Sequence, residues 1–418
     1  MLNFYQSFNL YRRFRMSKNT SVLDWIDTQH QSMVDLVTRW AKINTHTFNL
    51  TGLSELSKDI QWNMQVLQGK METLNLPGME FVNSRGEIEE RPLGAAIKMT
   101  KRPEAPKQVL LVCHMDTVYH PDTAAKSAVE LEDGFLRGPG ATDAKGGIVV
   151  MLKALEAIER SSVKNNLGWA VFLNSDEEVG SPGSKQFLQE LAPKSQIGLV
   201  FEPCLPNGNL VGERKGSGNF TLIVRGRSAH AGRDLHLGRN AIDVLAKCII
   251  KINSLTNTRH GLTVNIGLIE GGQALNVVPD MAIARFNIRL EKAEDEAHVW
   301  VDLKQIIVEM EKIDGIYVKL HGGFSSPPKV FDAKTSNLFH HAKACAQELG
   351  FDLDWQASGG VCDGNRLAAA GLPNIDTLGP RGGNIHSSNE FLAVESLTQR
   401  TKLAALFLMK IAEGEIKI

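Results

Sequence analysis

Apolar, strand-like runs in this chain end in acidic or imidazole side chains. Residues 109–113 are Val-Leu-Leu-Val-Cys, and His114 follows at once, with Asp116 two places later. Two further runs, at 168–174 and 197–201, show the same feature: Glu177 and Glu178 follow the first, and Glu202 follows the second. Buried strands normally end in turn residues, so these polar groups indicate a shared site.

Between these runs the apolar positions follow a helical spacing. Residues 145–161 repeat apolar side chains every three to four positions, and residues 183–192 form a shorter version. The alternation predicts an α/β fold, with a mostly parallel central sheet flanked by helices. A further strand is expected near 374–378 and a last helix from about Val394. Sheets of this kind bind ligands at the carboxyl ends of their strands.

The pattern changes near residue 213. From there to about 326 the expected elements run βαββαβ, which indicates an inserted α+β, ferredoxin-like sandwich domain. We therefore predict a catalytic domain that is split in sequence, 20–212 and 327–418, and an inserted lid or dimerisation domain at 213–326. Residues 1–19 are expected to be a disordered tail, ahead of an alternative start at Met16.

Composition and charge narrow the class of protein. The 418 residues carry a net charge of -1 without a long basic or acidic block, so neither nucleic acid nor a membrane is expected as a partner. The five cysteines form no CxxC pair, which favours a reducing compartment. The first 16 residues contain arginines but lack the apolar core of a secretory signal. A cytoplasmic location is expected, with a transit-like peptide as the alternative.

Five side chains at or near the strand ends suit metal binding, because imidazole nitrogen and carboxylate oxygen are ligands of zinc. They are His114, Asp143, Glu178, Glu202 and His386. Together they could hold two metal ions around a shared water. Asp143 stands in the glycine-rich stretch "GPGATDAKGG", which on its own could also be a simple strand-to-helix turn. Asp116 is expected to accept the second imidazole N–H of His114 and so to fix its tautomer.

Other residues are candidates for acid–base and substrate-binding roles. Glu177, next to a predicted ligand, could remain free as a general base. His230, at a strand end of the inserted domain, could donate to a developing oxyanion. Asn276 and Arg289 could polarise the substrate carbonyl and bind a carboxylate, although Arg289 alone would also fit a surface ion pair. No GxSxG motif is present, which argues against a serine hydrolase.

The ordered motifs resemble the co-catalytic zinc peptidase family, which includes glutamate carboxypeptidase, acetylornithine deacetylase, succinyl-diaminopimelate desuccinylase and aminoacylase. The resemblance covers about residue 20 to the C-terminus and is greatest to the bacterial glutamate carboxypeptidase branch. It rests on "HMDTV", "GPGATDAKGG", "NSDEEVGS", "FEP", "SAHAG" with "GRNAI", and "GGNIHSSNE".

The resemblance implies a role for each matching residue. Asp143 would bridge two Zn²⁺ ions per subunit, for which Co²⁺ or Mn²⁺ could substitute. One ion would be completed by His114 and Glu202, the other by Glu178 and His386. Glu177 would take the proton from the bridging water, and the peptide after Asp143 would be cis. His230 would reach the active site of a partner in a homodimer formed through the inserted domain.

The implied reaction is hydrolysis of an amide bond to a C-terminal amino acid, in the manner of a glutamate carboxypeptidase acting on a small peptide or N-acyl amino acid. Glutamate at position 202 favours carboxypeptidase or deacylase chemistry. Two features leave the substrate open: Leu235 replaces a proline common in the branch, and Arg381 could meet a substrate carboxylate or face solvent. The alternatives are an N-acyl amino acid deacylase or dipeptidase with the same metals, and a non-catalytic binding protein.

Overall fold

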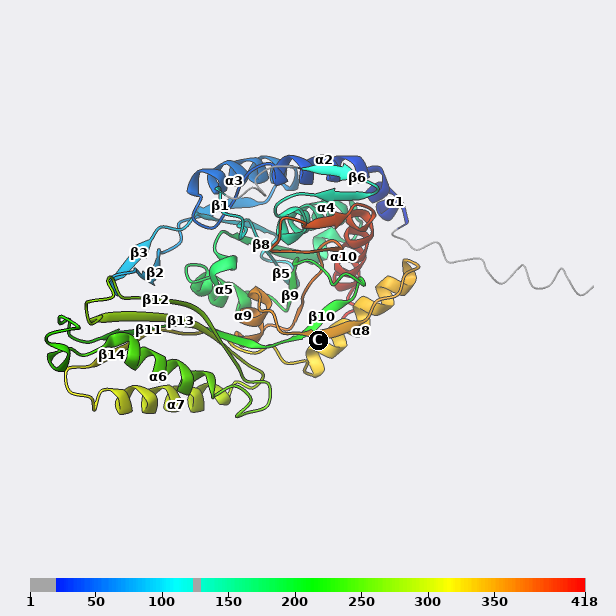
Figure 1. Cartoon of the computed structure of the whole chain (residues 1–418). Helices are drawn as coiled ribbons and strands as arrows, with labels where there is room; N and C mark the ends of the chain where they lie inside the picture. Colours follow the sequence, from blue (N-terminus) through cyan, green and yellow to red (C-terminus); the bar gives the residue numbers. More distant parts are fainter. Residues whose placement is uncertain (1–19, 123–128, 418) are drawn as a thin grey trace, which may run out of the picture.

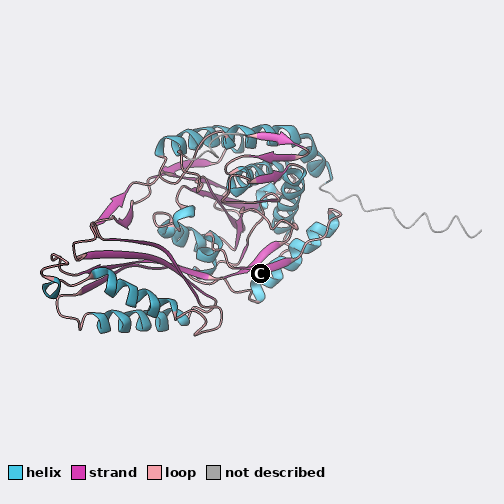
Figure 2. Ribbon diagram, viewed as in Figure 1, coloured by secondary structure: helices cyan, strands magenta, loops and turns pink. Residues whose placement is uncertain are grey.

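The computed structural model describes residues 20–122 and 129–417. The expected tail at 1–19 and the alternative start at Met16 lie outside these residues. The described chain has a larger part that combines helices with a central sheet, and a smaller part built on a second sheet (Figures 1 and 2). Among the described residues, no helix has the length and apolar character needed to span a membrane.

The central sheet has six strands, and its polarity is mostly parallel. In spatial order they are β1 (Lys70–Leu74), β4 (Ala96–Lys101), β8 (Leu167–Asn174), β5 (Lys107–His114), β9 (Ile197–Val200) and β16 (Asn374–Ile375). The strands β8, β5, β9 and β16 pair in parallel, whereas β1 and β4 are antiparallel. This arrangement confirms the predicted fold class.

Helices cover both faces of this sheet, which explains why its strands read as continuous apolar runs. In β5, Leu111 and Cys113 pack into one core cluster, and Leu110 and Val112 into another. The first cluster is closed by α1 (Thr20–Thr28), α2 (His30–Ala41), α3 (Leu50–Met64), α4 (Gly147–Arg160), α8 (Ala333–Glu348) and α10 (Glu395–Glu413). The second is closed by α5 (Lys185–Leu191) and α9 (Asp363–Ala369).

Several small strand pairs surround the central sheet, and the sequence pattern did not predict them. They are the hairpin of β2 (Met79–Val82) and β3 (Ile88–Arg91), the parallel pair of β10 (Leu210–Arg214) and β15 (Trp355–Ser358), and a four-stranded sheet of β17 (Gly382–Gly383), β18 (Phe391–Ala393), β7 (Phe135–Arg137) and β6 (Glu130–Glu132). The pairs β10–β15 and β7–β18 join segments that are far apart in sequence, whereas β2–β3 and β6–β7 are local.

The smaller part has the predicted βαββαβ order. Its elements are β11 (Gly216–Arg225), α6 (Ala241–Asn253), β12 (Thr263–Gly271), β13 (Met281–Leu290), α7 (Asp295–Met310) and β14 (Tyr317–Ser326). The sheet order is β12-β13-β11-β14, all antiparallel. Figure 1 shows α6 and α7 on one face of this sheet, with the larger part on the other side. The predicted boundaries 213 and 326 stay a prediction.

The chain passes from the larger part to the smaller part at Arg214 and returns at Lys329, and these two crossings lie side by side. The main chains of Arg214 and Lys329 exchange two hydrogen bonds of 3.0 Å as an antiparallel bridge. The guanidinium of Arg214 forms an ion pair with Asp376, whose side chain is fully buried in the larger part. The smaller part therefore leaves and re-enters the larger part at one place.

Candidate active site

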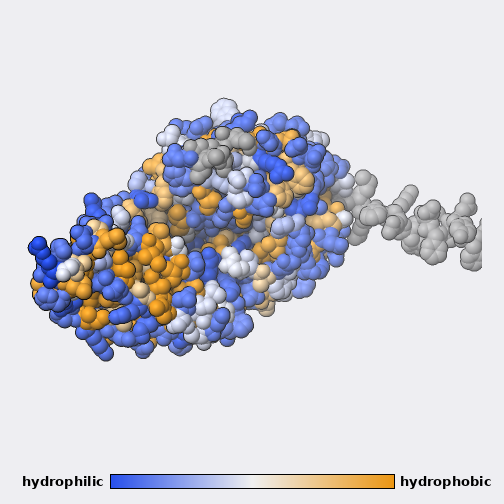
Figure 3. Space-filling model, in the orientation of Figure 1, coloured by the Kyte–Doolittle hydropathy of each residue, from blue (hydrophilic) through white to orange (hydrophobic). Residues whose placement is uncertain are grey.

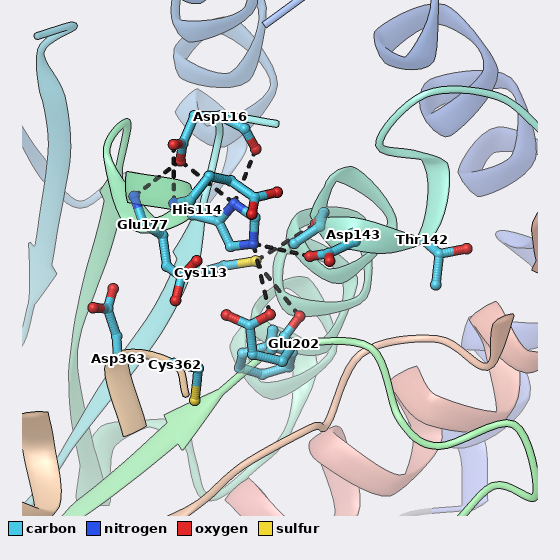
Figure 4. A network of polar contacts seen from close by, with 12 residues as sticks. Cys113, His114, Asp116, Thr142, Asp143, Glu177, Glu202, Cys362 and Asp363 are labelled. Carbon is cyan, nitrogen blue, oxygen red and sulfur yellow. Dashed lines mark hydrogen bonds and ion pairs between the residues drawn. The ribbon is translucent and has the colours of Figure 1, made fainter. Parts of the chain in front are cut away.

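The buried imidazole of His114, at the end of β5, lies among carboxylates from separate loops. Its Nε2 is 3.0 Å from Asp143 Oδ1 and 3.6 Å from Glu202 Oε2. Figure 4 shows His114 between Asp116 on one side and Asp143 and Glu202 on the other. Because β5 and β9 are parallel neighbours, His114 and Glu202 follow strands that end at the same sheet edge.

Asp143 lies between two histidines. Its Oδ1 faces His114, and its Oδ2 is 3.3 Å from His386 Nε2. The same His386 nitrogen is 3.3 Å from Glu178 Oε2. The structure thus brings all five predicted ligand side chains together, and one possible ligand atom each from His114, Asp143 and Glu178 lies within 4.8 Å of the others.

The charges of this cluster favour a bound cation. Burial raises the pKa of Glu178 to about 7 and also raises the pKa of Glu202. Hydrogen bonds to Asp143 and Glu178 raise the pKa of His386 to about 10. Buried carboxylates of like charge are costly to hold together without positive charge among them. Because the donors are imidazole nitrogen and carboxylate oxygen, the residues fit metal ions of the zinc type.

A carboxylate that the sequence analysis missed holds the loop that presents Asp143. Glu390 is buried and accepts hydrogen bonds from the main-chain N–H groups of Gly140 (2.9 Å), Thr142 (2.8 Å) and Asp143 (3.0 Å), and from the Tyr119 hydroxyl (2.5 Å). The peptide bond between Asp143 and Ala144 is cis, as the resemblance implied. The signal that could have revealed Glu390 is its place four residues after His386 in "HSSNE".

Asp116 faces His114 with both its main-chain oxygen and its carboxylate. Nδ1 of His114 lies 2.9 Å from the main-chain oxygen of Asp116, whereas the nearer carboxylate oxygen is 3.5 Å away. The carboxylate accepts instead from the N–H groups of Glu177 and Glu178, each at 3.2 Å, and from the Thr47 hydroxyl at 2.7 Å. The carboxylate still lies within ion-pair distance of the imidazole, so its predicted role as the partner of His114 stays a prediction. The carboxylate fixes the turn that carries the two glutamates.

Glu177 lines the cavity beside the cluster. Burial and the nearby Glu202 raise the pKa of its carboxyl well above the ordinary value. An amide-bearing substrate that entered the cavity would meet this side chain together with Asp143, Glu178, Glu202 and His386, all of which line the same space. A carboxyl with a raised pKa in this position suits proton transfer.

His230 and Asn276 lie away from this cluster. Both are exposed and adjacent in the smaller part, where the main-chain N–H of Ala231 donates to the Asn276 carbonyl at 3.0 Å. His230 Nδ1 accepts from the N–H of Gly232 at 3.1 Å. Neither residue belongs to the cavity lining. Within one chain, the predicted contact of these two residues with the reaction centre is absent from the described structure.

The two predicted carboxylate-binding arginines have different positions. Arg289 lines the cavity, where its Nε donates to Asn287 Oδ1 and its Nη1 to the Gly359 carbonyl, both at 2.9 Å. Arg381 instead forms an ion pair with Glu395 and is not part of the lining. The Arg381 side chain is 40% exposed, in agreement with the alternative that it faces solvent, and its contact with a substrate carboxylate stays a prediction.

The cavity has a volume of about 430 Å³ and lies between the two parts of the chain. It adjoins a more open groove of about 1140 Å³ between the β2–β3 hairpin and the sheet of the smaller part. Five residues line both spaces: Val179, Gly180, Asn219, Asn287 and Ser325. A ligand bound at the cluster can therefore extend into the groove.

The sequence of this chain matches the model of Peptidase family M20/M25/M40 over residues 110–410. The chain belongs to this family. The match covers the cluster and the smaller part, and it makes the protein a hydrolase of the metallopeptidase type, as the sequence predicted. The alternative of a non-catalytic binding protein is set aside.

Individual relatives in the M20 family differ in activity. The chain is 28% identical to Carboxypeptidase G2 from Pseudomonas sp. (strain RS-16) over 312 residues, which cover 74% of this chain and 75% of that protein. It is 27% identical to succinyl-diaminopimelate desuccinylase from Nitrosospira multiformis over 300 residues, 66% of this chain and 74% of that protein.

Solved structures with the same fold include the dipeptidase Dug1p from Saccharomyces cerevisiae, with a TM-score of 0.74 and 15% identity, over 96% of this chain and 99% of that chain. The aminopeptidase PepT from Bacillus cereus gives a TM-score of 0.70 with 22% identity, over 92% of this chain and 99% of that chain. These likenesses confirm the fold class.

Proposed function

We propose that this protein is a metal-dependent exopeptidase that hydrolyses the amide bond to a C-terminal amino acid. The observation that carries the proposal is the position of Asp143, whose two carboxylate oxygens face His114 and His386 separately. A carboxylate shared in this way would suit a pair of bound metal ions. We assign one ion to His114 and Glu202, the other to Glu178 and His386, and zinc as the metal, with cobalt or manganese as substitutes.

The chain's own residues would divide the reaction among them. Bound zinc lowers the pKa of a coordinated water to about 7 and polarises the substrate carbonyl. Glu177 would accept a proton from the attacking water, whose oxygen bonds to the amide carbonyl carbon, and would then give the proton to the amine as the C–N bond breaks, acting first as base and then as acid. Arg289 binds the terminal carboxylate of the substrate, because its planar guanidinium can contact both oxygens.

A deacylase is the second candidate, because the chain resembles a succinyl-diaminopimelate desuccinylase nearly as closely as it resembles Carboxypeptidase G2. Both reactions use the same residues and differ only in the acyl group. The open groove next to the cavity would hold that group. A panel of N-acyl amino acids and dipeptides distinguishes the two candidates. A peptidase should prefer dipeptides, whose acyl group carries a free amine, and a deacylase should prefer N-acyl amino acids, whose acyl group does not.

The test of the proposed function is the Glu177→Ala variant together with the wild-type enzyme, both loaded with zinc. The wild type should hydrolyse members of the panel and lose this activity in a chelator. Glu177→Ala should bind as much zinc as the wild type, and kcat should fall about 10²–10⁴-fold. Unchanged turnover in Glu177→Ala would refute the assignment of the base.

We also propose a homodimer through the smaller part. Strand β12 is an edge strand, and exposed apolar side chains surround it: Ile242, Ile250, Leu268, Ile269, Leu275 and Val277. Figure 3 shows hydrophobic surface gathered over this part of the molecule. Large exposed apolar patches mark interaction sites, and an unpaired edge invites pairing with a second chain. In this dimer, the side chains of His230 and Asn276 would extend into the cavity of the partner subunit.

Sedimentation velocity tests the dimer. Ile250 on α6 is 71% exposed, and Ile250→Lys should convert the dimer to a monomer. Val308→Lys on α7, where the side chain is 50% exposed, is the matched control and should leave the dimer intact. A wild-type protein that sediments as a monomer at micromolar concentration would exclude this proposal.

We place the protein in the cytoplasm. All five cysteines are free and buried in the described structure, so none depends on an oxidising environment for a disulfide.

A further inference from the structure

We infer that the amino acid released by this enzyme has an apolar, uncharged side chain, not that of glutamate. The inference rests on the proposed function, in which Arg289 binds the terminal carboxylate of the substrate. It follows from the charged and apolar groups that line the cavity between the two parts of the chain.

One of the two arginines in the lining, Arg214, is already held in an ion pair with Asp376, which Lys329 Nζ also approaches to 3.6 Å. Arg214 Nη2 donates to Asp376 Oδ1 at 2.9 Å, its Nε forms a second bond to the same carboxylate, and its Nη1 donates to the Gly360 carbonyl at 3.1 Å. The Asp376 side chain is fully buried and cannot move into water. Because Arg214 also holds the chain crossing to Lys329, it is fixed in this bidentate pair.

Arg289 is the other arginine, and it is half-buried. Its hydrogen bonds go to neutral oxygens of Asn287 and Gly359. Among the described residues, no carboxylate lies within ion-pair distance of it. One arginine that is free for a carboxylate can satisfy the terminal group of any C-terminal amino acid. A glutamate substrate brings a second carboxylate, for which the lining offers no second unpaired arginine and no lysine.

The remaining lining offers a second carboxylate no basic side chain outside the cluster that would hold the metal ions. Besides the two arginines, its ionisable side chains are those of the cluster (Asp143, Glu177, Glu178, Glu202 and His386) and the thiols of Cys204 and Cys362. The lining also includes six apolar residues, here called the apolar wall: Pro203, Leu205, Pro206, Val211, Val361 and Ile385. A side-chain carboxylate placed there would lose its hydration without gaining a cation. An apolar side chain would instead bury its surface against this wall.

This inference differs from the glutamate preference that the family resemblance implied. The reaction that the resemblance implies depends on the metal ligands and on Glu177, whose proposed roles concern the scissile amide and not the side chain of the released amino acid. Side-chain preference depends on the lining of the cavity, and here the pairing of Arg214 with Asp376 removes a cation that the sequence alone would count as available.

The test uses the zinc-loaded full chain and N-acetyl and glycyl derivatives of methionine, leucine, glutamine and glutamate. Methionine, glutamine and glutamate are similar in length, so the series isolates polarity and charge. We expect kcat/KM for methionine and leucine to exceed that for glutamate at least about tenfold, with glutamine between them; tenfold corresponds to about 1.4 kcal/mol. A value for glutamate equal to or above that for methionine would overturn the inference.

A binding measurement separates this inference from the proposed function. Calorimetry with Glu177→Ala and the free amino acids should give at least about tenfold tighter binding of methionine than of glutamate. If no derivative is hydrolysed but methionine binds more tightly, the proposed reaction fails and the inference about the pocket stands. If glutamate binds as tightly, the inference fails whatever the activity.

A gain of preference should follow from adding a cation to the wall. Val361→Lys should raise kcat/KM for glutamate relative to methionine at least about tenfold, because it supplies the missing partner for the second carboxylate. Val66→Lys is the matched control at an exposed position of the larger part, outside the lining, and should leave the ratio unchanged. If Val361→Lys does not fold, Leu205→Lys tests the same wall, and a folded variant with an unchanged ratio counts against the inference.

Discussion

The carboxylate of Asp116 shows how one residue can organise a site without entering the cavity. It is fully buried, and it receives the main-chain N–H groups of both Glu177 and Glu178. Its main-chain oxygen faces the imidazole of His114 at the same time. One residue therefore fixes a predicted base and two predicted ligands relative to one another.

Replacement of Asp116 by asparagine should weaken metal binding. The amide nitrogen would face an N–H donor of the turn, so one hydrogen bond would be lost and the turn would shift. We expect metal affinity to fall about 10–100-fold, as for other residues that orient metal ligands. Chelator competition measures this loss, and Asp24→Asn on the exposed side of α1 is the control. Equal affinities in both variants would show that the turn holds its position without the carboxylate.

Glu159 predicts how stability depends on pH. Burial raises the pKa of this carboxyl, but hydrogen bonds from Arg102 and Lys101 outweigh burial and lower the pKa from 4.5 to about 2. A folded-state pKa below the unfolded one means that the stabilisation is full above pH 4.5 and is lost as pH falls toward 2.

The Glu159→Gln variant should therefore lower the free energy of unfolding by about 1–3 kcal/mol at pH 7. The difference from the wild type should shrink steadily below pH 4.5. Denaturant unfolding at pH 7, 4 and 3 measures it. A difference that stays constant over this range would mean that packing, not charge, is responsible.

For single residues, the sequence predicted which side chains come together in the candidate site, but it did not predict how some of them interact. His114, Asp143 and His386 could be selected because imidazole and carboxylate groups at strand ends have few structural uses. Glu395, the ion-pair partner of Arg381, could not be predicted from the sequence, because the chain brings the two side chains together only after it has turned through β17 and β18. Nor can spacing distinguish the main-chain oxygen of Asp116 from its carboxylate.

At the scale of elements, Gly147 sets the distance between the start of α4 and the end of β9. A Cβ atom at this position would lie 2.0 Å from the main-chain oxygen of Phe201. Because Asp143 precedes α4 and Glu202 follows Phe201, this close approach brings two predicted metal ligands together. The glycine is needed here for its lack of a side chain.

The Gly147→Ala variant should push α4 away from β9. We expect an unfolding free energy lower by about 1–3 kcal/mol, as for other overpacked positions, together with weaker metal binding. Thermal unfolding and metal titration measure the two effects. Gly267→Ala is the control, because its nearest neighbouring atom would lie 3.8 Å from the new Cβ. Full metal affinity in Gly147→Ala would show that the helix can shift without moving Asp143.

The elements that could be predicted were those with strong local patterns. The strand β5 and the helix α4 are apolar enough to be recognised from their own residues, and so is the βαββαβ order of the smaller part. The hairpin β2–β3 is half-exposed and rich in glutamate, so its sequence has no clear alternation. The two-residue strands β16 and β17 are defined by their neighbours, and a local pattern cannot reveal them.

At the scale of the whole molecule, the proposed dimer makes a quantitative prediction. His230→Ala and Glu177→Ala should each be inactive as homodimers. If His230 acts in the partner's cavity, a mixed dimer has one intact site, and an equal mixture of the variants after re-association should recover about one quarter of wild-type activity. Activity of separate and mixed samples measures this. No recovery, with mixed dimers demonstrated by mass, would show that His230 does not act in the partner's cavity.

The adjacent crossings at Arg214 and Lys329 give the molecule a modular construction. The main chains of these two residues are joined by a pair of hydrogen bonds, so the first and last residues of the smaller part are neighbours in space. A short peptide linker could close that gap, and deletion of the segment between the crossings would leave every strand of the central sheet connected in its present order. The larger part could therefore have existed as a continuous gene product before the other was spliced into it, and a shortened protein of this kind would still carry every proposed metal ligand.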